Sequence, residues 1–381
     1  MPKTPTRLLA IALPVLLLGT VQLGGCLRRS IPPPPPGGVY RSVSGGAQFV
    51  QSVRLLDDDA KLIGYIAELA VHSLHRTTTN PQVVYITAGQ QGIYRSSDEG
   101  ENWQAVAQPL TVATSVVELT NGVLLASGTN SGEGIVTRSL DHGASWERVL
   151  TMPALYRKKK ALFEIIKPPP PPPVYVSSMV PDPFDPERVY ATTSTGEVLS
   201  GEQSGKLWRT LIRVQSGQRD PLTNQAIASI RKIFTSPHRA NELLVITTSG
   251  GLVRYRDGEL KTFELPQGTV VDASYIAQFP EALFVGTDRG AIISRDSGST
   301  WQELDLPISG SAPVRSVVVR VSPTNPTRLL IAVDSIIYRS EDGGQTFNTL
   351  SLGLPGHLIT DLSIHPANAA HVLLSAAPAP T

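Results

Sequence analysis

The residues of this chain with the clearest chemical pattern are serine and aspartate pairs at a fixed spacing. Each pair belongs to a motif Ser-x-Asp-x-Gly-x-x-Trp/Phe, and its four clear copies are Ser96, Asp98, Gly100 and Trp103; Ser139, Asp141, Gly143 and Trp146; Ser294, Asp296, Gly298 and Trp301; and Ser340, Asp342, Gly344 and Phe347. Carboxylates in loops can bind calcium, but each motif supplies too few of them for such a site. Short Asp and Ser side chains instead bond the backbone of a tight turn, and glycine permits a positive φ. We therefore predict a structural role for these residues.

Signatures of known catalytic sites are missing from the sequence. It contains no HExxH, no Gly-x-Ser-x-Gly, no P-loop and no Gly-x-Gly-x-x-Gly. His72 and His75 could ligate a metal, but scattered strand and turn histidines explain them better. We expect no catalytic residue, no metal and no cofactor, and hence no enzyme. A pair of carboxyl groups flanking a groove, as in glycosidases, stays open because sequence alone cannot place it.

The composition indicates a β-rich chain without a nucleic-acid partner. There are 33 Lys and Arg against 32 Asp and Glu, which gives a net charge of +1 and no strongly basic face. Glycine and proline number 32 each, and they separate short runs of Val, Ile, Leu and Tyr. Such punctuation predicts many short strands and little helix.

The N-terminal residues have the features of a secretory signal. Lys3 and Arg7 precede an apolar run at 8–18, and small residues lead to Cys26, the single cysteine of the chain. This arrangement resembles the lipobox of bacterial lipoproteins, although an ordinary signal peptide is the alternative. We predict a signal peptide at 1–25 and a lipid-anchored, proline-rich spacer at 26–37. The protein would then lie in the bacterial cell envelope, outside the cytoplasm and bound to a membrane through lipidated Cys26.

The repeats decide the fold. The aromatic ends of clear and degenerate copies lie roughly 40 to 60 residues apart, at Phe49, Trp103, Trp146, Trp208, Phe263, Trp301 and Phe347. A proline-containing turn and a β-rich run precede most copies, so each unit reads as four strands. The first copy, at 37–51, has only the third and fourth strands, and the tail at 358–364 and 372–375 supplies a first and second. The sequence predicts an all-β, seven-bladed propeller over 38–381, closed by pairing its two ends in one blade.

With these motifs, the chain resembles the Asp-box, or BNR-repeat, β-propellers from Gly37 to about Ala376. That class includes bacterial sialidases, xyloglucanases, the sortilin ectodomain and the photosystem II stability/assembly factors. The resemblance to assembly factors and sortilin implies a non-enzymatic scaffold that binds a protein or peptide. Sialidases have an Arg-Ile-Pro motif, which this sequence lacks, and xyloglucanases use two propellers. A cell-surface glycan-binding or glycoside-hydrolase-like propeller is the alternative function.

The candidate partner-binding residues lie where the repeat is interrupted. A basic, proline-rich insertion at 152–173 carries Arg157, Lys158, Lys159 and Lys160, and a second long connection at 214–228 carries Arg219. The insertion could bind anionic lipid or an acidic partner, or it could be a solvated loop. Asp288, Arg289 and Asp334 are expected on the same face, in turns between second and third strands. We expect a monomer that binds a protein or peptide of unknown identity.

Overall fold

The computed structural model describes residues 37–152, 173–213, 230–266, 268–308, 314–354 and 356–379. All of them belong to one compact unit, Pro35–Thr381. The signal peptide, Cys26 and the spacer fall outside these ranges, as do Arg157, Lys158, Lys159, Lys160 and Arg219. The assignments made for these residues therefore stay predictions.

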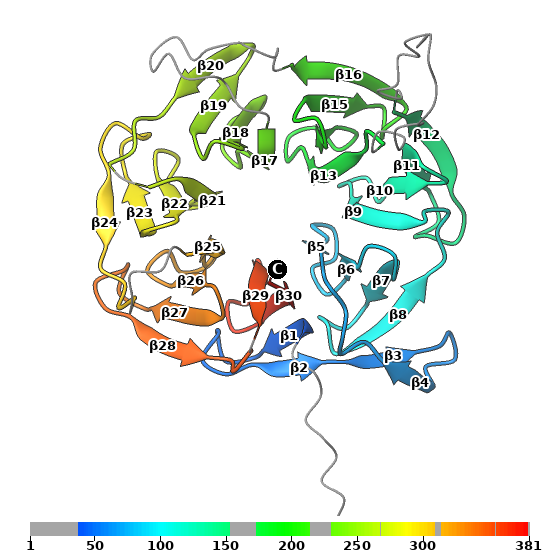
Figure 1. Cartoon of the computed structure of the whole chain (residues 1–381), viewed down its shortest axis with the longest axis horizontal. Helices are drawn as coiled ribbons and strands as arrows, with labels where there is room; N and C mark the ends of the chain where they lie inside the picture. Colours follow the sequence, from blue (N-terminus) through cyan, green and yellow to red (C-terminus); the bar gives the residue numbers. More distant parts are fainter. Residues whose placement is uncertain are drawn as a thin grey trace, which may run out of the picture. The chain divides into compact units, whose positions relative to one another are not determined.

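The described residues form seven blades arranged in a ring, each built on four antiparallel strands (Figure 1). Blade 1 contains β5 (Ser73–Arg76), β6 (Val84–Thr87), β7 (Ile93–Ser96) and β8 (Asn102–Val106), with an added pair, β3 (Arg54–Leu56) and β4 (Leu62–Tyr65). Blade 2 contains β9 (Val112–Glu118), β10 (Leu124–Asn130), β11 (Glu133–Ser139) and β12 (Glu147–Thr151). Blade 3 contains β13 (Val176–Pro181), β14 (Val189–Thr193), β15 (Val198–Glu202) and β16 (Leu207–Ile212).

The other half of the ring repeats this order. Blade 4 contains β17 (Ile230–Thr235), β18 (Glu242–Thr247), β19 (Leu252–Arg256) and β20 (Glu259–Thr262). Blade 5 contains β21 (Val270–Tyr275), β22 (Leu283–Thr287), β23 (Gly290–Ser294) and β24 (Gln302–Leu304). Blade 6 contains β25 (Val317–Val321), β26 (Leu329–Val333), β27 (Ile336–Ser340) and β28 (Asn348–Ser351). Blade 7 contains β29 (His357–Ile364), β30 (Val372–Pro378), β1 (Gly38–Ser42) and β2 (Val50–Ser52).

Blade 7 confirms the predicted closure of the ring. Its strand order, β2-β1-β30-β29, joins two strands from each end of the chain. Val39 pairs with Ser375 and Arg41 with Leu373 in the antiparallel register that unites the ends. The partial repeat at 37–51 is therefore the outer half of the last blade. Pairing both ends in one sheet removes the exposed sheet edges that an open ring would leave there.

The core lies between neighbouring blades. The second strand of most blades is buried along its whole length, as in β18 and β26, because a blade packs on each of its faces. One cluster joins blades 4 and 5 through Leu244 and Val285, and another joins blades 5 and 6 through Phe284 and Ile331. Strands covered on both faces read as continuous apolar runs in the sequence. This explains why those runs identified the blades.

The added strands β3 and β4 were not predicted. β2 and β3 are separated only by Val53, so this stretch of chain passes from the sheet of blade 7 to the sheet of blade 1. There β3 pairs in parallel with β8, and β4 pairs antiparallel with β3. The sequence signal was the long interval between Phe49 and Trp103, which leaves room for more than one four-stranded unit requires.

Candidate functional site

The predicted Ser and Asp residues of the repeat bond within their own turns. In the first clear copy the Ser96 hydroxyl donates to Asp98 Oδ1 over 2.8 Å, and Gly100 N–H donates to Ser96 Oγ over 2.8 Å. Hydrogen bonds to its carboxylate lower the pKa of Asp141 to about 2, and the bond from the Ser145 hydroxyl has the largest effect. Carboxylates that already accept several bonds are occupied in shaping the turn. The same two bonds recur in the other three copies, formed by Ser139, Asp141 and Gly143; by Ser294, Asp296 and Gly298; and by Ser340, Asp342 and Gly344.

The aromatics and glycines of the repeat contact the preceding blade. Trp103 Nε1 donates to Ser52 Oγ of blade 7 over 2.8 Å, and Trp146 Nε1 donates to the carbonyl of Ala107 over 2.7 Å. Gly298 has a φ of +79°, and a Cβ added there would lie 2.3 Å from Phe263 Cε1 of blade 4. Only glycine fits this combination of dihedral angle and close approach.

Two other glycines of the repeat, Gly143 and Gly344, have a role that differs from the predicted one. The sequence pattern predicts a role in the turn alone, through the positive φ that glycine permits. In the structure they also lie against the preceding blade. A Cβ added to Gly143 would lie 2.7 Å from Val106 Cγ1 of blade 1, and one added to Gly344 would lie 2.9 Å from Leu304 Cδ2 of blade 5. The motif therefore holds neighbouring blades together as well as shaping its own turn, which no local pattern could show.

The described residues among the predicted partner contacts lie in equivalent turns of blades 5 and 6. Asp288 Oδ1 accepts a bond from Thr269 N over 2.8 Å, and Asp334 Oδ1 accepts one from Arg315 N over 2.9 Å. Each carboxylate therefore holds the backbone that leads into the first strand of its own blade. Arg289, beside Asp288, is exposed. No direct contact joins Asp334 to the Asp288–Arg289 pair among the described residues.

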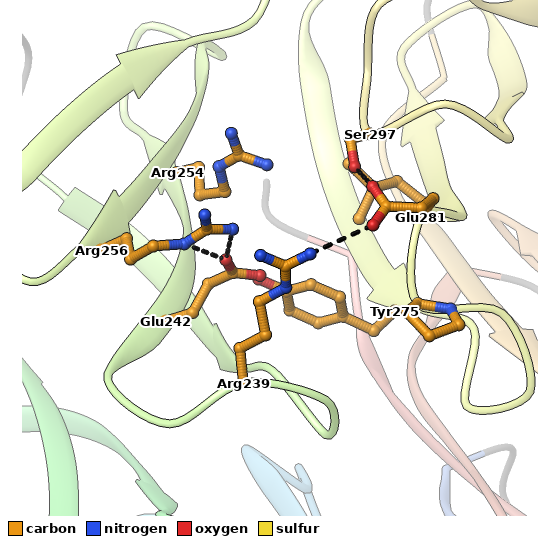
Figure 2. A pocket seen from close by; sticks show the side chains of 9 residues that line it. Arg239, Glu242, Arg254, Arg256, Tyr275, Glu281 and Ser297 are labelled. Atoms are coloured by element: carbon orange, nitrogen blue, oxygen red, sulfur yellow. Dashed lines mark hydrogen bonds and ion pairs between the residues drawn. The ribbon is translucent and has the colours of Figure 1, made fainter.

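A pocket rich in arginine, which no sequence motif marks, lies between blades 4 and 5 (Figure 2). Its lining residues are Arg239, Glu242, Arg254, Arg256, Tyr275, Pro280, Glu281, Leu283 and Ser297. They come from β18, β19, β21 and β22 and from the turns that precede β18, precede β22 and follow β23. Arg254 and Arg256 point to the same side of β19 because side chains two residues apart share a face of a strand. In the sequence, the spacing of these two arginines is the signal that points to the pocket. The rest of the pocket forms only where blades 4 and 5 are in contact.

Ion pairs fix most of the charged side chains of this arginine pocket. Arg256 Nε donates to Glu242 Oε2 over 2.7 Å, and the Tyr275 hydroxyl donates to Glu242 Oε1 over 3.2 Å. Burial raises the pKa of Tyr275, so its hydroxyl stays a donor at neutral pH. On the other side, Arg239 donates to Glu281 Oε1 over 3.1 Å. Two of the three guanidinium groups are thus held in place by carboxylates.

The third arginine of the pocket leaves it with a surplus positive charge. The Arg254 guanidinium lies 5.8 Å from the centre of the Phe263 ring, a cation–π distance. Among the described residues no carboxylate forms an ion pair with it. Figure 2 shows its guanidinium group on the same side of the pocket as that of Arg256. The pocket therefore suits an anionic group, which Arg254 could bind without breaking an existing ion pair.

A second group of charges connects the first strands of four blades. Asp272 of β21, with 1% of its surface exposed, pairs with Lys232 of β17 over 2.6 Å and with Arg320 of β25 over 2.6 Å. Arg320 also pairs with Asp361 of β29 over 2.5 Å. Burial alone would raise the pKa of Asp272, but Lys232 and Arg320 together lower it. This network joins blades 4, 5, 6 and 7 to one another.

His75 should make the fold sensitive to acid. Its Nε2 accepts a bond from Glu118 N over 3.0 Å, and burial lowers its pKa to about 4. The folded state resists protonation, so stability present above the unfolded pKa of about 6.5 is lost as the pH falls toward 4. The contribution lost is about 3 kcal/mol. Urea unfolding of wild type and His75→Gln at pH 7 and pH 4 should show the larger decrease in wild type, and equal decreases would contradict the assignment.

Two further features concern the described ranges only. In that part of the chain, no three His, Cys, Asp or Glu side chains gather as a metal site. No helix there has the length and apolar character needed to cross a membrane.

The fold defines the class of protein: the described chain is a seven-bladed β-propeller closed by its own termini. It is structurally similar to YCF48 from Cyanidioschyzon merolae, with 15% identity, a TM-score of 0.59, and 81% of this chain and 96% of that chain covered. It is also similar to YCF48 bound to a D1 peptide, with 16% identity, a TM-score of 0.55, and coverage of 81% and 92%. These matches confirm the predicted likeness to photosystem II assembly factors at the level of fold.

A third similar structure is an enzyme. The GH74 xyloglucanase from Xanthomonas campestris shares 15% identity at a TM-score of 0.59, over 82% of this chain but only 51% of the enzyme. This chain thus spans about half of that xyloglucanase. No protein-family model matches the sequence, and no curated protein matches it. At these identities the likeness is one of fold.

Proposed function

We propose that this protein is a non-enzymatic binding or assembly scaffold that holds an acidic segment of a protein partner in the arginine pocket. The observation that carries the proposal is the surplus charge of Arg254 beside two arginines fixed by ion pairs. An acidic side chain or a C-terminal carboxylate would form charge-assisted bonds with Arg254. Because Arg239 and Arg256 are already ordered, little conformational entropy is lost when such a group binds.

The comparison with YCF48 supports a peptide ligand, since a propeller of this fold has been solved with a D1 peptide bound. The pocket also contains two carboxylates, Glu242 and Glu281, which raises the alternative of a glycosidase. Both are paired with arginine, whereas a glycosidase needs one carboxyl group that carries a proton for the leaving group. The pairing therefore favours binding over hydrolysis.

The proposal places the scaffold outside the cytoplasm of a bacterium, tethered to a membrane through lipidated Cys26. The basic start, the apolar run at 8–18 and the small residues before Cys26 support this location. A proline-rich spacer after the cysteine would hold the propeller away from the lipid surface. Growth with a labelled fatty acid tests the anchor, because a Cys26→Ser variant should lose the label.

Binding by the pocket can be measured with a fluorescent peptide in which aspartate and glutamate alternate with serine. Fluorescence anisotropy should show binding to the wild-type protein that weakens as salt is raised. Arg254→Ala should weaken it about 10-fold or more, the loss expected for one bond between charged groups. An uncharged peptide with asparagine and glutamine in the same positions should not bind measurably.

Arg295→Ala is the matched control, because Arg295 is an exposed arginine in the Ser-x-Asp turn of blade 5 and lies outside the pocket. It should leave peptide affinity unchanged. Equal binding by Arg254→Ala and wild type would reject the pocket as the site. Release of sugar from xyloglucan by wild type but not by Glu242→Gln would replace the scaffold with a glycosidase.

A further inference from the structure

Among the described residues, the outer edge of blade 1 has a feature that the other blades lack. The β3–β4 hairpin extends its sheet to six strands, in the order β4-β3-β8-β7-β6-β5, and β4 pairs with β3 alone among the described strands. Figure 1 shows β4 at the rim of the ring, beyond β8. A strand at the edge of a sheet presents unpaired N–H and C=O groups that can bond another chain.

The side chains of β4 are apolar and exposed. Leu62, Ile63 and Tyr65 expose 41%, 58% and 67% of their surface. No other strand in the described part of the chain has more than one large apolar side chain this exposed. Edge strands are usually protected by charge, as in β20, where Glu259 and Lys261 flank Leu260. The four residues of β4 carry no charge.

The backbone register shows which groups of β4 face outward. Ile66 N–H donates to the carbonyl of Val53 over 2.8 Å, and Tyr65 lies opposite Arg54 in β3. Residues of an antiparallel strand alternate between facing their partner and facing away, so the N–H and C=O of Tyr65 point to the open side. At the other end, the Lys61 carbonyl accepts a bond from Asp57 N over 3.0 Å, which turns the groups of Leu62 outward.

The shape of the hairpin is set by its own turn. Asp57 Oδ1 accepts bonds from Asp59 N over 3.1 Å and from Lys61 N over 2.9 Å. The edge is therefore ordered before any partner arrives, which lowers the entropy lost on binding.

Charges in the turn before β4 select the partner. The turn exposes Asp58 and Asp59 against one cation, Lys61, so this end of the strand is acidic. At the other end, exposed Glu68 follows the strand and exposed Arg54 of β3 lies opposite Tyr65. The acidic turn would repel an anionic membrane. It favours a segment with basic residues beside its apolar ones.

We propose that the open edge of β4 is a docking site for an extended, apolar segment of a partner polypeptide with lysine or arginine at its ends, which joins blade 1 as a further strand. Main-chain bonds would supply affinity, and the flanking charges would supply specificity. The site lies in blade 1 and shares no residue with the arginine pocket between blades 4 and 5. It therefore holds whether or not the pocket binds acidic peptides.

The test uses the full chain and a labelled peptide of about nine residues, alternating threonine and valine between paired lysines. A second peptide with glutamate in place of lysine serves as the charge control. Fluorescence anisotropy should show binding of the lysine peptide at least about 10-fold tighter than the glutamate peptide. Asp58→Lys with Asp59→Lys should reverse that preference, and equal binding of both peptides would overturn the proposal.

Tyr65→Pro separates the backbone from the side chain. The N–H it removes faces outward and makes no bond to β3, so the hairpin should persist. Tyr65→Val keeps that N–H and is the matched control. Affinity should fall about 10-fold or more in Tyr65→Pro relative to Tyr65→Val. Equal affinity of these two variants, or sedimentation showing a dimer of the wild type that Tyr65→Pro dissociates, would reject a partner strand. If Tyr65→Pro lowers the melting temperature, the charge-reversal variant decides.

Discussion

Replacement of Asp272 by alanine is expected to lower the free energy of unfolding by about 3–5 kcal/mol. The Asp272 carboxylate is buried between Lys232 and Arg320, each 2.6 Å away, and it also accepts a bond from Val319 N over 3.0 Å. Its removal leaves Lys232 and the buried Val319 N–H without this partner and leaves Arg320 paired with Asp361 alone. Urea unfolding followed by tryptophan fluorescence at neutral pH would measure the change.

Asp361→Ala provides the comparison within the same network. Asp361 also pairs with Arg320, but its side chain is 25% exposed, so water can replace part of what is lost. We expect a decrease of about 1 kcal/mol for this variant. A third protein with apolar residues at Asp272, Lys232 and Arg320 together should regain most of the lost stability, because no buried charge is left unpaired. Equal effects of Asp272→Ala and Asp361→Ala would contradict the assigned roles.

This network also bears on how the propeller presents a ligand. It spans the first strands of blades 4, 5, 6 and 7, and the arginine pocket is built on two of these blades. Arg239 and Arg254 belong to blade 4, whereas Glu281 belongs to blade 5. Any shift of blade 4 relative to blade 5 would change the distance from these two arginines to Glu281. The ion pair between Lys232 and the buried Asp272 joins the same two blades and opposes such a shift.

The fold was predictable from the sequence because each blade repeats the same local pattern. Gly100 and Trp103 mark a tight turn, and the apolar run of β6 marks a strand with a blade on each side. Both signals are local, so they can be read without knowing the neighbours. The closure of blade 7 followed because the partial repeat at 37–51 and the tail complete each other.

The arginine pocket and the β3–β4 hairpin were not predictable in the same way. Arg254 belongs to blade 4, whose copy of the repeat is degenerate, and its pocket partners come from separate turns and from blade 5. Their convergence depends on how two blades pack, which no local pattern records. Residues 54–65 lie between two repeat units, so the long interval from Phe49 to Trp103 leaves room for them but does not show what structure they form. The binding role of Arg157, Lys158, Lys159, Lys160 and Arg219 stays a prediction.

Replacement of Trp103 by alanine should be the most damaging change to a residue of the repeat, with a loss of about 3–5 kcal/mol in the free energy of unfolding. The indole is fully buried among residues of blades 1 and 7, including Val39 and Leu373. Its removal opens a cavity where the two ends of the chain meet the first blade. Calorimetry should show a lower melting temperature, and limited proteolysis should show faster cleavage at the N-terminal strands.

Trp103→Phe and Ser52→Ala separate packing from hydrogen bonding at this closure. The phenylalanine keeps most of the buried surface but loses the bond from Nε1 to Ser52 Oγ, so we expect a loss of about 1–2 kcal/mol. Ser52→Ala leaves the buried indole N–H without its acceptor and should cost about 1–3 kcal/mol. In the double variant the two losses should add to less than their sum, because both remove the same bond. Full additivity would show that the bond between blades 1 and 7 contributes nothing, and that Trp103 stabilises this contact by packing alone.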